Sequence, residues 1–197
     1  MRDYEEIKRE LRGPAVLIQA PFKSNYDLDL KALRENISYV MEEGIVKGRG
    51  FIICPCGTGE YVALSREEHR KMVETAVDVA GDKLPVVAGV ASCFYKEAIK
   101  LIKNSEEAGA TCVMVPPPYY YLIDQKTVIK WYQTLANETE MAIMAYNQLW
   151  RGIGTHFTIE TMSELAKIES MISFKYGGEI MRDYIICLLY TSPSPRD

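Results

Sequence analysis

Residues 85–115, PVVAGVASCFYKEAIKLIKNSEEAGATCVMV, contain two short apolar runs on either side of a segment with helical periodicity. The runs, Pro85–Gly89 and Thr111–Val115, are continuously apolar, which is typical of parallel strands covered on both faces. Between them, Ile99, Ile102 and Ala108 form an apolar stripe at helical spacing. This stretch therefore predicts a strand, a helix and a second strand parallel to the first.

The same alternation continues in both directions along the chain. Four further apolar runs are predicted strands: Ala15–Ile18, Gly50–Cys54, Met141–Tyr146 and Met171–Lys175. Helix starts are indicated by a capping box at Ser65–Glu68 and an N-cap at Thr158, and a leading helix is expected over Tyr4–Leu11. Successive strands begin roughly 30 residues apart, the length of one βα unit of an eightfold barrel. We predict an α/β fold, a TIM (βα)₈ barrel of which about six βα units are present; a six-stranded doubly wound sheet is the alternative.

Composition and charge exclude several classes of protein. The 197 residues are 48% hydrophobic and 25% charged, as expected of a globular domain. The net charge of −4 argues against nucleic acid or an anionic membrane as a partner. The apolar runs are too short to span a bilayer and the N-terminus is charged, so we expect a cytoplasmic protein. The five cysteines lack the spacing of a disulfide framework or a zinc site, so no metal is expected.

Chemistry in a barrel gathers at the C-terminal ends of the strands. There, Gly57-Thr58-Gly59 follows the second predicted strand, and its glycines would let backbone N–H groups approach a carboxylate or a phosphate. The residue at position 62 is Val62 and no Gly-Lys-Ser/Thr follows, which excludes a dinucleotide fingerprint and a P-loop. A tight turn without any ligand is the alternative reading of this loop.

Three later strand ends carry polar side chains. Prolines after the fourth strand would aim Tyr119–Tyr121 across the barrel mouth or toward a subunit interface. Tyr146 at the end of the fifth strand can relay protons, and Arg151 beyond it can clamp a carboxylate, although such an arginine is often only solvated. Lys175 ends the sixth strand, where an apolar site would favour the neutral amine that attacks a carbonyl group. A lysine that extends out of the barrel mouth is the alternative.

Several short motifs occur in an order that resembles a known protein family. They are Ala20-Pro21-Phe22, Gly57-Thr58-Gly59-Glu60, Leu64-Ser65-Arg66-Glu67-Glu68-His69, Val87-Ala88-Gly89-Val90, Pro117-Pro118-Tyr119-Tyr120, Tyr146-Asn147 and Phe174-Lys175. From about Gly13 to Ile186, the chain resembles the dihydrodipicolinate synthase / N-acetylneuraminate lyase family of class I Schiff-base lyases.

The resemblance implies a (βα)₈ barrel that uses no cofactor and is usually a homotetramer. It implies that Lys175 condenses with the keto group of pyruvate or a related 2-keto acid, and that Tyr146 is the general acid and base. Thr58 and the backbone N–H groups of the adjoining Gly57 and Gly59 would hold the carboxylate of the keto acid. The small-molecule keto acid and further copies of the chain are thus the expected partners.

Other positions narrow the expected reaction. Tyr120 matches a tyrosine that reaches a neighbouring subunit's site to extend the proton relay, and Arg151 aligns, within one residue, with an arginine that binds a dicarboxyl substrate in the synthases. Gly57, however, stands where most synthases and lyases carry Thr or Ser. Gly-Thr-Gly-Glu before an aromatic residue, with Phe174-Lys175-Tyr-Gly-Gly, resembles the 5-dehydro-4-deoxyglucarate dehydratase branch. We expect aldol cleavage, aldol condensation or dehydration, with a non-catalytic carboxylate-binding barrel as the alternative.

The C-terminal residues suggest a boundary. Residues 187–197, CLLYTSPSPRD, break the preceding helical pattern with a Pro-Ser-Pro stretch. They back-translate without a mismatch to a transposase adapter used in sequencing libraries. We expect residues 1–186 to be a partial barrel domain and residues 187–197 to be a non-native tail, so that an inactive gene fragment is a further alternative.

Overall fold

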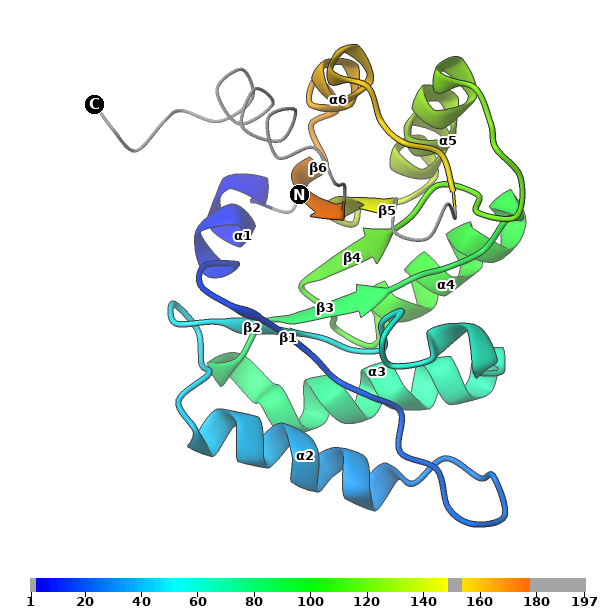
Figure 1. Cartoon of the computed structure of the whole chain (residues 1–197). Coiled ribbons are helices and arrows are strands. Elements are labelled where there is room, and N and C mark those ends of the chain that lie inside the picture. The colour runs from blue at the N-terminus through cyan, green and yellow to red at the C-terminus, as the bar shows by residue number, and fades with distance from the viewer. Residues whose placement is uncertain (1–2, 149–153, 178–197) are drawn as a thin grey trace.

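In the part of the chain that the structure describes, six parallel strands form one sheet, and their order across the sheet is their order along the chain. The structure, a computed structural model, describes residues 3–148 and 154–177. Figure 1 shows the larger helices arranged along the outer side of the curving sheet. The strands are β1 (Ala15–Leu17), β2 (Phe51–Ile53), β3 (Val86–Gly89), β4 (Cys112–Val115), β5 (Ile143–Gln148) and β6 (Met171–Gly177). The helices are α1 (Tyr4–Glu10), α2 (Leu30–Glu42), α3 (Arg66–Ala80), α4 (Tyr95–Glu107), α5 (Gln125–Glu138) and α6 (Ile159–Leu165), with short 3₁₀ helices η1 (Tyr61–Ala63) and η2 (Gly81–Lys83).

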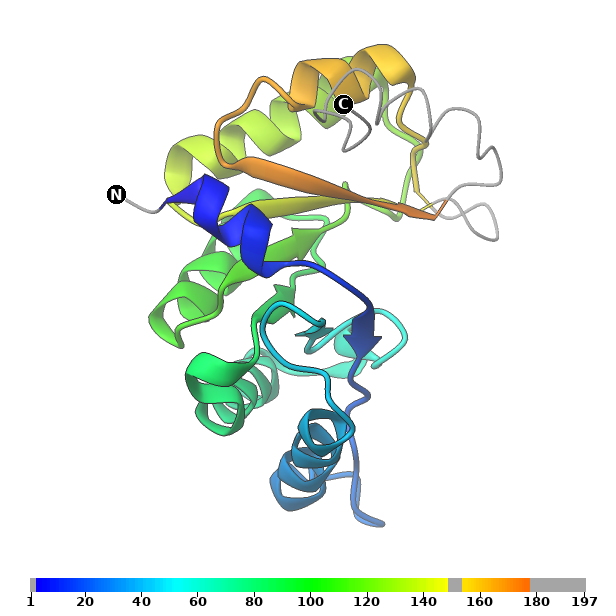
Figure 2. The ribbon, with the colours of Figure 1, turned by 90° about the vertical axis from the view of Figure 1, so that its left-hand side faces the viewer.

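The strand order distinguishes between the two predicted architectures. A doubly wound sheet reverses direction at a switch point, so some consecutive strands are not neighbours. Here each strand pairs with the next one along the chain, and the sheet curls instead of reversing (Figure 2). The described strands therefore form an incomplete TIM barrel, which confirms the predicted fold.

Side chains of the strands alternate between an inner and an outer core. In β4, Cys112 and Met114 belong to the inner core, whereas Val113 and Val115 pack outward against the helices. All four are fully buried. Burial on both faces explains why the strand sequences are continuously apolar instead of alternating between apolar and polar residues.

Helix α1 lies at the N-terminal end of the inner core. Its Tyr4 and Ile7 pack against inner-core side chains, and the Tyr4 hydroxyl donates a hydrogen bond to the backbone oxygen of Glu140 at 3.1 Å. In Figure 2, α1 (blue) lies beside β6 (orange). The opposite end of the strands, where their C-termini lie, is not covered by α1 and carries the loops described below.

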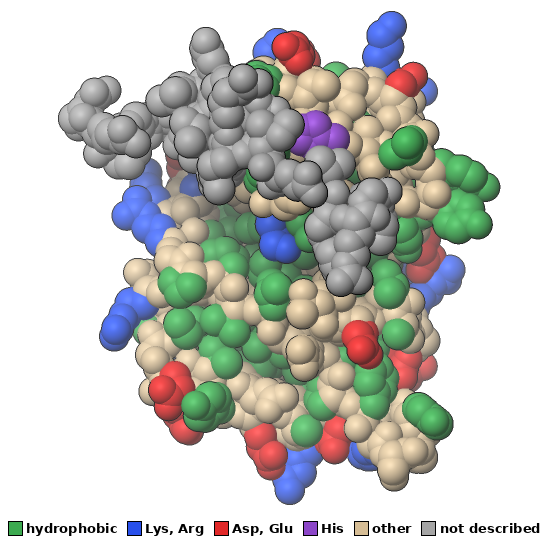
Figure 3. All heavy atoms as spheres, viewed as in Figure 1, with side chains coloured by type: hydrophobic (Ala, Val, Ile, Leu, Met, Phe, Trp, Pro, Cys, Tyr) green, Lys and Arg blue, Asp and Glu red, His purple; other side chains and the backbone are tan. Residues whose placement is uncertain are grey.

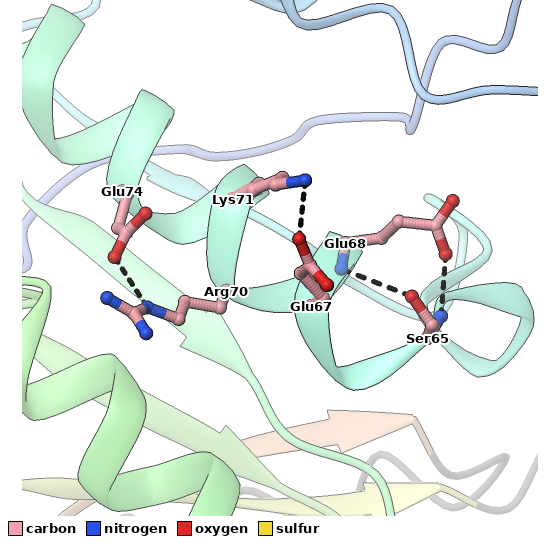
Figure 4. A network of polar contacts seen from close by, with 6 residues as sticks. All are labelled: Ser65, Glu67, Glu68, Arg70, Lys71 and Glu74. Atoms are coloured by element: carbon pink, nitrogen blue, oxygen red, sulfur yellow. Dashed lines mark hydrogen bonds and ion pairs between the residues drawn. The ribbon is translucent and has the colours of Figure 1, made fainter.

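Side-chain caps fix the helix starts as predicted. The Ser65 hydroxyl accepts from the backbone N–H of Glu68 at 3.2 Å, and the Glu68 carboxylate accepts from the N–H of Ser65 at 2.8 Å. Thr158 caps α6 in the same way by accepting from the N–H of Thr161. Figure 4 shows the capping box of α3 together with two exposed ion pairs, Glu67–Lys71 and Arg70–Glu74. Within the described ranges, none of the helices combines the length and the apolar character needed to cross a membrane.

The predicted bounds hold within one residue for β1–β4 but not for β5 and β6. Both of these strands run two residues further than predicted, to Gln148 and Gly177. The additional residues pair with each other, as in Asn147 with Tyr176. Backbone pairing therefore continues beyond the apolar run, and a prediction based on hydrophobicity ends too early.

His69 connects α3 to the end of β3. Its side chain is 4% exposed, and Nε2 donates to the carbonyl of Gly89 at 2.8 Å. Burial lowers the pKa of His69, and this effect outweighs the opposing influence of the Gly89 carbonyl and of Glu97. The folded protein therefore holds this histidine in its neutral form.

We predict that this burial makes stability depend on pH. A histidine in the unfolded chain has a pKa of about 6.5, so below that pH the unfolded state binds a proton that folded His69 resists. The free energy of unfolding should therefore be highest above about pH 7 and should fall as the pH decreases toward about 5. Urea titrations across this range should show a smaller decrease for His69→Gln than for the unchanged protein. An unchanged dependence in His69→Gln would contradict this assignment.

Candidate active site

A cavity of about 300 Å³ lies at the C-terminal ends of the strands. It brings together four of the predicted site residues: Gly57, Thr58, Tyr146 and Lys175. The other lining residues are Leu17, Cys56, Tyr61, Val62, Tyr119 and Gln148. Loops after β2 and β4 thus meet the ends of β5 and β6, as expected for a barrel active site.

Lys175 faces Tyr146 because of an irregularity in the pairing of β5 with β6. The pairing of Ile143 with Met171 is followed by a shift, so that Ile172 is an additional residue in β6. After the shift, Tyr146 pairs with Lys175. Since alternate residues of a strand point to opposite faces, an unshifted pairing would turn the Lys175 side chain toward the helices.

The amine of Lys175 lies over the ring of Tyr146. Its Nζ is 3.9 Å from the ring centroid, within the range at which an ammonium group is attracted to the face of an aromatic ring. Tyr146 is buried, with 7% of its surface exposed, and Lys175 is partly buried. The two side chains are therefore held in contact at the wall of the cavity.

Asn147 holds the chain around this pair. It is fully buried, its side-chain oxygen accepts from the N–H of Phe157 at 3.2 Å, and its side-chain nitrogen lies 3.4 Å from Nδ1 of His156. Both contacts join the end of β5 to the segment before α6. Because buried amide groups need such partners, Asn147 limits how far the end of β5 can move.

The loop after β2 is tied closely to β1. A Cβ atom on Gly59 would lie 2.2 Å from the backbone oxygen of Ile18, so a larger residue cannot fit. The Gly59 carbonyl accepts from the N–H of Ala20 at 3.3 Å, and the Gly59 N–H donates to Sγ of Cys56 at 3.2 Å. Gly59 therefore shapes the loop, while Thr58 lies exposed at the rim of the cavity.

A tyrosine and a thiol that were not predicted from the sequence, Tyr61 and Cys56, also line the cavity. Tyr61 is 8% exposed and Cys56 is 1% exposed. Burial raises the pKa of Tyr61, and the nearby Tyr146 and Tyr119 raise it further. Burial likewise raises the pKa of the Cys56 thiol. The signal that could have identified Tyr61 is an aromatic residue four positions after Gly57, because a glycine leaves room for a large side chain beside it.

One predicted site residue, Tyr120, lies away from this cavity, and another, Arg151, falls outside the described residues. Tyr120 is 75% exposed and packs edge-on against Tyr121, with ring centroids 4.7 Å apart, and it is Tyr119 that lines the cavity. The role of Tyr120 in a neighbouring subunit's site stays a prediction. Arg151 and residues 187–197 lie outside the described residues, so the predictions that involve them remain predictions.

A second cavity, of about 520 Å³, extends toward the N-terminal end of the strands. It is lined by Lys8 and Leu11 near α1 and by inner-core side chains such as Phe51 and Ile172, and Lys175 lines both cavities. Figure 3 shows hydrophobic side chains gathered over the middle of the face seen in Figure 1. Lys175 thus stands between a largely apolar interior and a polar rim.

A family model described as the dihydrodipicolinate synthetase family matches residues 10–194. Curated relatives include a 4-hydroxy-tetrahydrodipicolinate synthase from Syntrophus aciditrophicus, 38% identical over 165 residues that cover 83% of this chain and 54% of that protein. The enzyme of the same name from Methanothermobacter thermautotrophicus is 32% identical over 166 residues that cover 84% of this chain and 57% of that protein. The chain spans about half the length of the curated relatives it matches.

Solved structures of dihydrodipicolinate synthases also match this chain. The chloride-inhibited dihydrodipicolinate synthase from Acinetobacter baumannii, complexed with pyruvate, has a TM-score of 0.85 and 26% identity, and the match covers 90% of this chain and 60% of that one. Dihydrodipicolinate synthase from Aquifex aeolicus also has a TM-score of 0.85, with 28% identity and a match over 93% of this chain and 61% of that one.

We predict that Gly59→Ala destabilises the loop after β2, because its Cβ would overlap a backbone oxygen that cannot move aside. The expected loss is about 1–3 kcal/mol or more of unfolding free energy. Gly57→Ala is the matched control, since its Cβ would lie 3.3 Å from Cε1 of the Tyr61 side chain, which can shift slightly. Chemical denaturation of both variants tests this difference, and equal stabilities would contradict it.

Proposed function

Because the chain belongs to the dihydrodipicolinate synthetase family, we propose that the protein is a lyase that bonds pyruvate or a related 2-keto acid to Lys175 as a Schiff base. The observation that carries the proposal is the pairing of Lys175 with Tyr146 across β5 and β6 at the wall of the cavity. Imine formation needs a nucleophilic amine and a group that moves protons, and these two side chains supply both.

The covalent step uses Lys175 as the nucleophile. The neutral amine attacks the keto carbon of the substrate, and the carbonyl oxygen takes up a proton to give a carbinolamine. The hydroxyl then leaves as water while nitrogen forms a double bond to carbon. Counted from the ammonium form of Lys175, the products are a protonated imine and water, without net gain or loss of protons. The imine withdraws electrons from the adjacent carbon and stabilises the carbanion formed there.

Tyr146 moves the protons in this sequence. Its hydroxyl carries a proton from the attacking nitrogen to the departing oxygen, and later to or from the carbon next to the imine. Its contact with Lys175, 3.9 Å from Nζ to the ring centroid, supports this role. Thr58, at the rim of the same cavity, is positioned to accept the substrate carboxylate with its hydroxyl as donor.

The substrate is a small 2-keto acid. One of the matched structures is described as complexed with pyruvate, and the curated relatives are named for a synthase reaction. The Gly57-Thr58-Gly59-Glu60 stretch, which resembles the 5-dehydro-4-deoxyglucarate dehydratase branch, supports a longer sugar acid as the alternative substrate. Condensation with pyruvate is therefore the first reaction to test, and dehydration of a 2-keto-3-deoxy sugar acid is the second.

Further copies of the chain are the proposed protein partner. Tyr120, Tyr121 and Leu122 are adjacent and are 75%, 73% and 80% exposed. Adjacent exposed apolar side chains of this size commonly mark an interaction surface. A homo-oligomer that covers them would place Tyr120 at the edge of a neighbouring subunit.

We predict that borohydride traps an adduct on Lys175. The protein that carries this chain is incubated with pyruvate or with a 2-keto-3-deoxy sugar acid, reduced, and analysed by peptide mass spectrometry. The adduct should be lost in Lys175→Met, because no amine remains to attack the carbonyl. In Tyr146→Phe its formation should be slower by about 10²–10⁴-fold, the usual contribution of general acid–base catalysis.

Lys167→Met provides the control, because Lys167 is an exposed lysine on the surface, paired with Glu164 at 2.5 Å. This variant should form the adduct at the original rate. The keto acid that is trapped more efficiently identifies the branch of the family. If neither keto acid forms an adduct with the folded protein, the Schiff-base lyase is excluded and a carboxylate-binding barrel is favoured.

A further inference from the structure

Tyr61 occupies the space that a side chain at position 57 would otherwise fill. A Cβ atom built on Gly57 would lie 3.3 Å from Cε1 of Tyr61 and 3.9 Å from its hydroxyl oxygen. The phenol of Tyr61 thus reaches the part of the cavity wall toward which residue 57 would project. A hydroxyl group is therefore present at this point although Gly57 cannot supply one.

The backbone holds Tyr61 in this position. Its N–H donates to the carbonyl of Cys56 at 3.1 Å, and its carbonyl accepts from the N–H of Leu64 at 3.4 Å. The preceding residue, Glu60, has a left-handed conformation with φ of 61°, which turns the chain back toward the cavity. Tyr61 is 8% exposed in consequence, and its ring is part of the wall that also contains Tyr146.

A proton shuttle such as Tyr146 needs a second group with which it can exchange protons. Tyr146 is 7% exposed, so water has little direct access to it. Tyr61 lines the same cavity, and Tyr146 lies close enough to contribute to the raised pKa of Tyr61. Tyr119, on the loop after β4, also lines this cavity and is less buried.

We propose that Tyr61 is a proton-relay residue that reprotonates Tyr146, directly or through one water molecule, in place of a hydroxyl at position 57. This inference rests on the proposed Schiff-base function. When Tyr146 gives its proton to the departing oxygen of the carbinolamine, Tyr61 passes its own proton to Tyr146 and takes one from water at the cavity mouth. Tyr61 acts through Tyr146 and forms no bond to the substrate.

The ionisation of Tyr61 is consistent with this role. Burial, together with Tyr146 and Tyr119, raises its pKa above the ordinary value of a tyrosine. The phenol therefore stays protonated at neutral pH and can donate one proton while it accepts another. Because Tyr61 accepts one proton as it donates another, the relay leaves no net charge on the largely apolar wall of the cavity.

The test compares Tyr61→Phe, Gly57→Ser/Tyr61→Phe and Tyr39→Phe in the protein that carries this chain. Tyr39 is on α2 and 62% exposed, so its variant controls for the loss of a tyrosine hydroxyl. The readouts are the rate at which the methyl protons of pyruvate exchange with deuterium oxide, followed by NMR, and the final amount of borohydride-trapped Lys175 adduct. Exchange requires the imine and repeated proton transfer, whereas the final amount of adduct requires only the imine.

We expect Tyr61→Phe to slow the exchange by about 10–10²-fold, at the lower end of acid–base contributions because water can partly replace the relay. The final amount of adduct should remain at the original level. Gly57→Ser/Tyr61→Phe should recover at least part of the rate, because the serine hydroxyl projects toward the position of the lost phenol. Tyr39→Phe should match the unchanged protein in both measurements.

Exchange at the original rate in Tyr61→Phe, with slow exchange in Tyr146→Phe, would overturn the relay and leave the proposed function intact. Slow exchange in Tyr61→Phe that is not faster in Gly57→Ser/Tyr61→Phe would also overturn the relay, because Tyr61 would then have only a packing role. Failure of the unchanged protein to form any adduct would instead refute the proposed function itself. The two failures are therefore distinguishable.

Discussion

In the pairing of β5 with β6, Ile172 is skipped, and every later residue of β6 is shifted by one position relative to a regular ladder. Because strand side chains alternate between faces, this shift decides which face receives Lys175. The shifted register places Lys175 opposite Tyr146 in the inner cavity and leaves Phe174 to pack outward against the outer core. Backbone pairing thus brings together Lys175 and Tyr146, the proposed nucleophile and the proposed proton donor.

Close backbone contacts build the opposite wall of the cavity. Gly59 approaches the carbonyl of Ile18, just after β1, and Gly89 at the end of β3 approaches the carbonyl of Pro55, where an added Cβ would lie 2.3 Å away. These glycines let the loop after β2 pack between its two neighbouring strands. The loop holds Thr58 at the rim and Tyr61 in the wall, so the proposed substrate contact and the proposed relay residue belong to the same short segment.

The sequence predicts the architecture well because both faces of each strand are buried, which produces continuous apolar runs at a regular interval. Their positions at strand ends predict Lys175 and Tyr146 as site residues, although the sequence does not reveal that they contact each other. The additional residue in β6 could not be predicted, since Met171–Phe174 contains no glycine or proline to mark a bulge. Tyr61 was missed for a related reason: the direction of its ring is set by the turn at Glu60 and by the space beside Gly57, which only the folded backbone defines.

Two potential nucleophiles, Lys175 and Cys56, line the cavity, and their surroundings assign them different tasks. The Cys56 sulfur is 1% exposed, donates to the Ile18 carbonyl at 3.6 Å and accepts from the Gly59 N–H at 3.2 Å. Burial raises the pKa of this thiol despite the opposing influence of Lys175, which leaves little of the reactive thiolate. Cys56 therefore fastens the loop to the segment just after β1, and Lys175, partly exposed at the cavity, is the nucleophile of the proposed reaction.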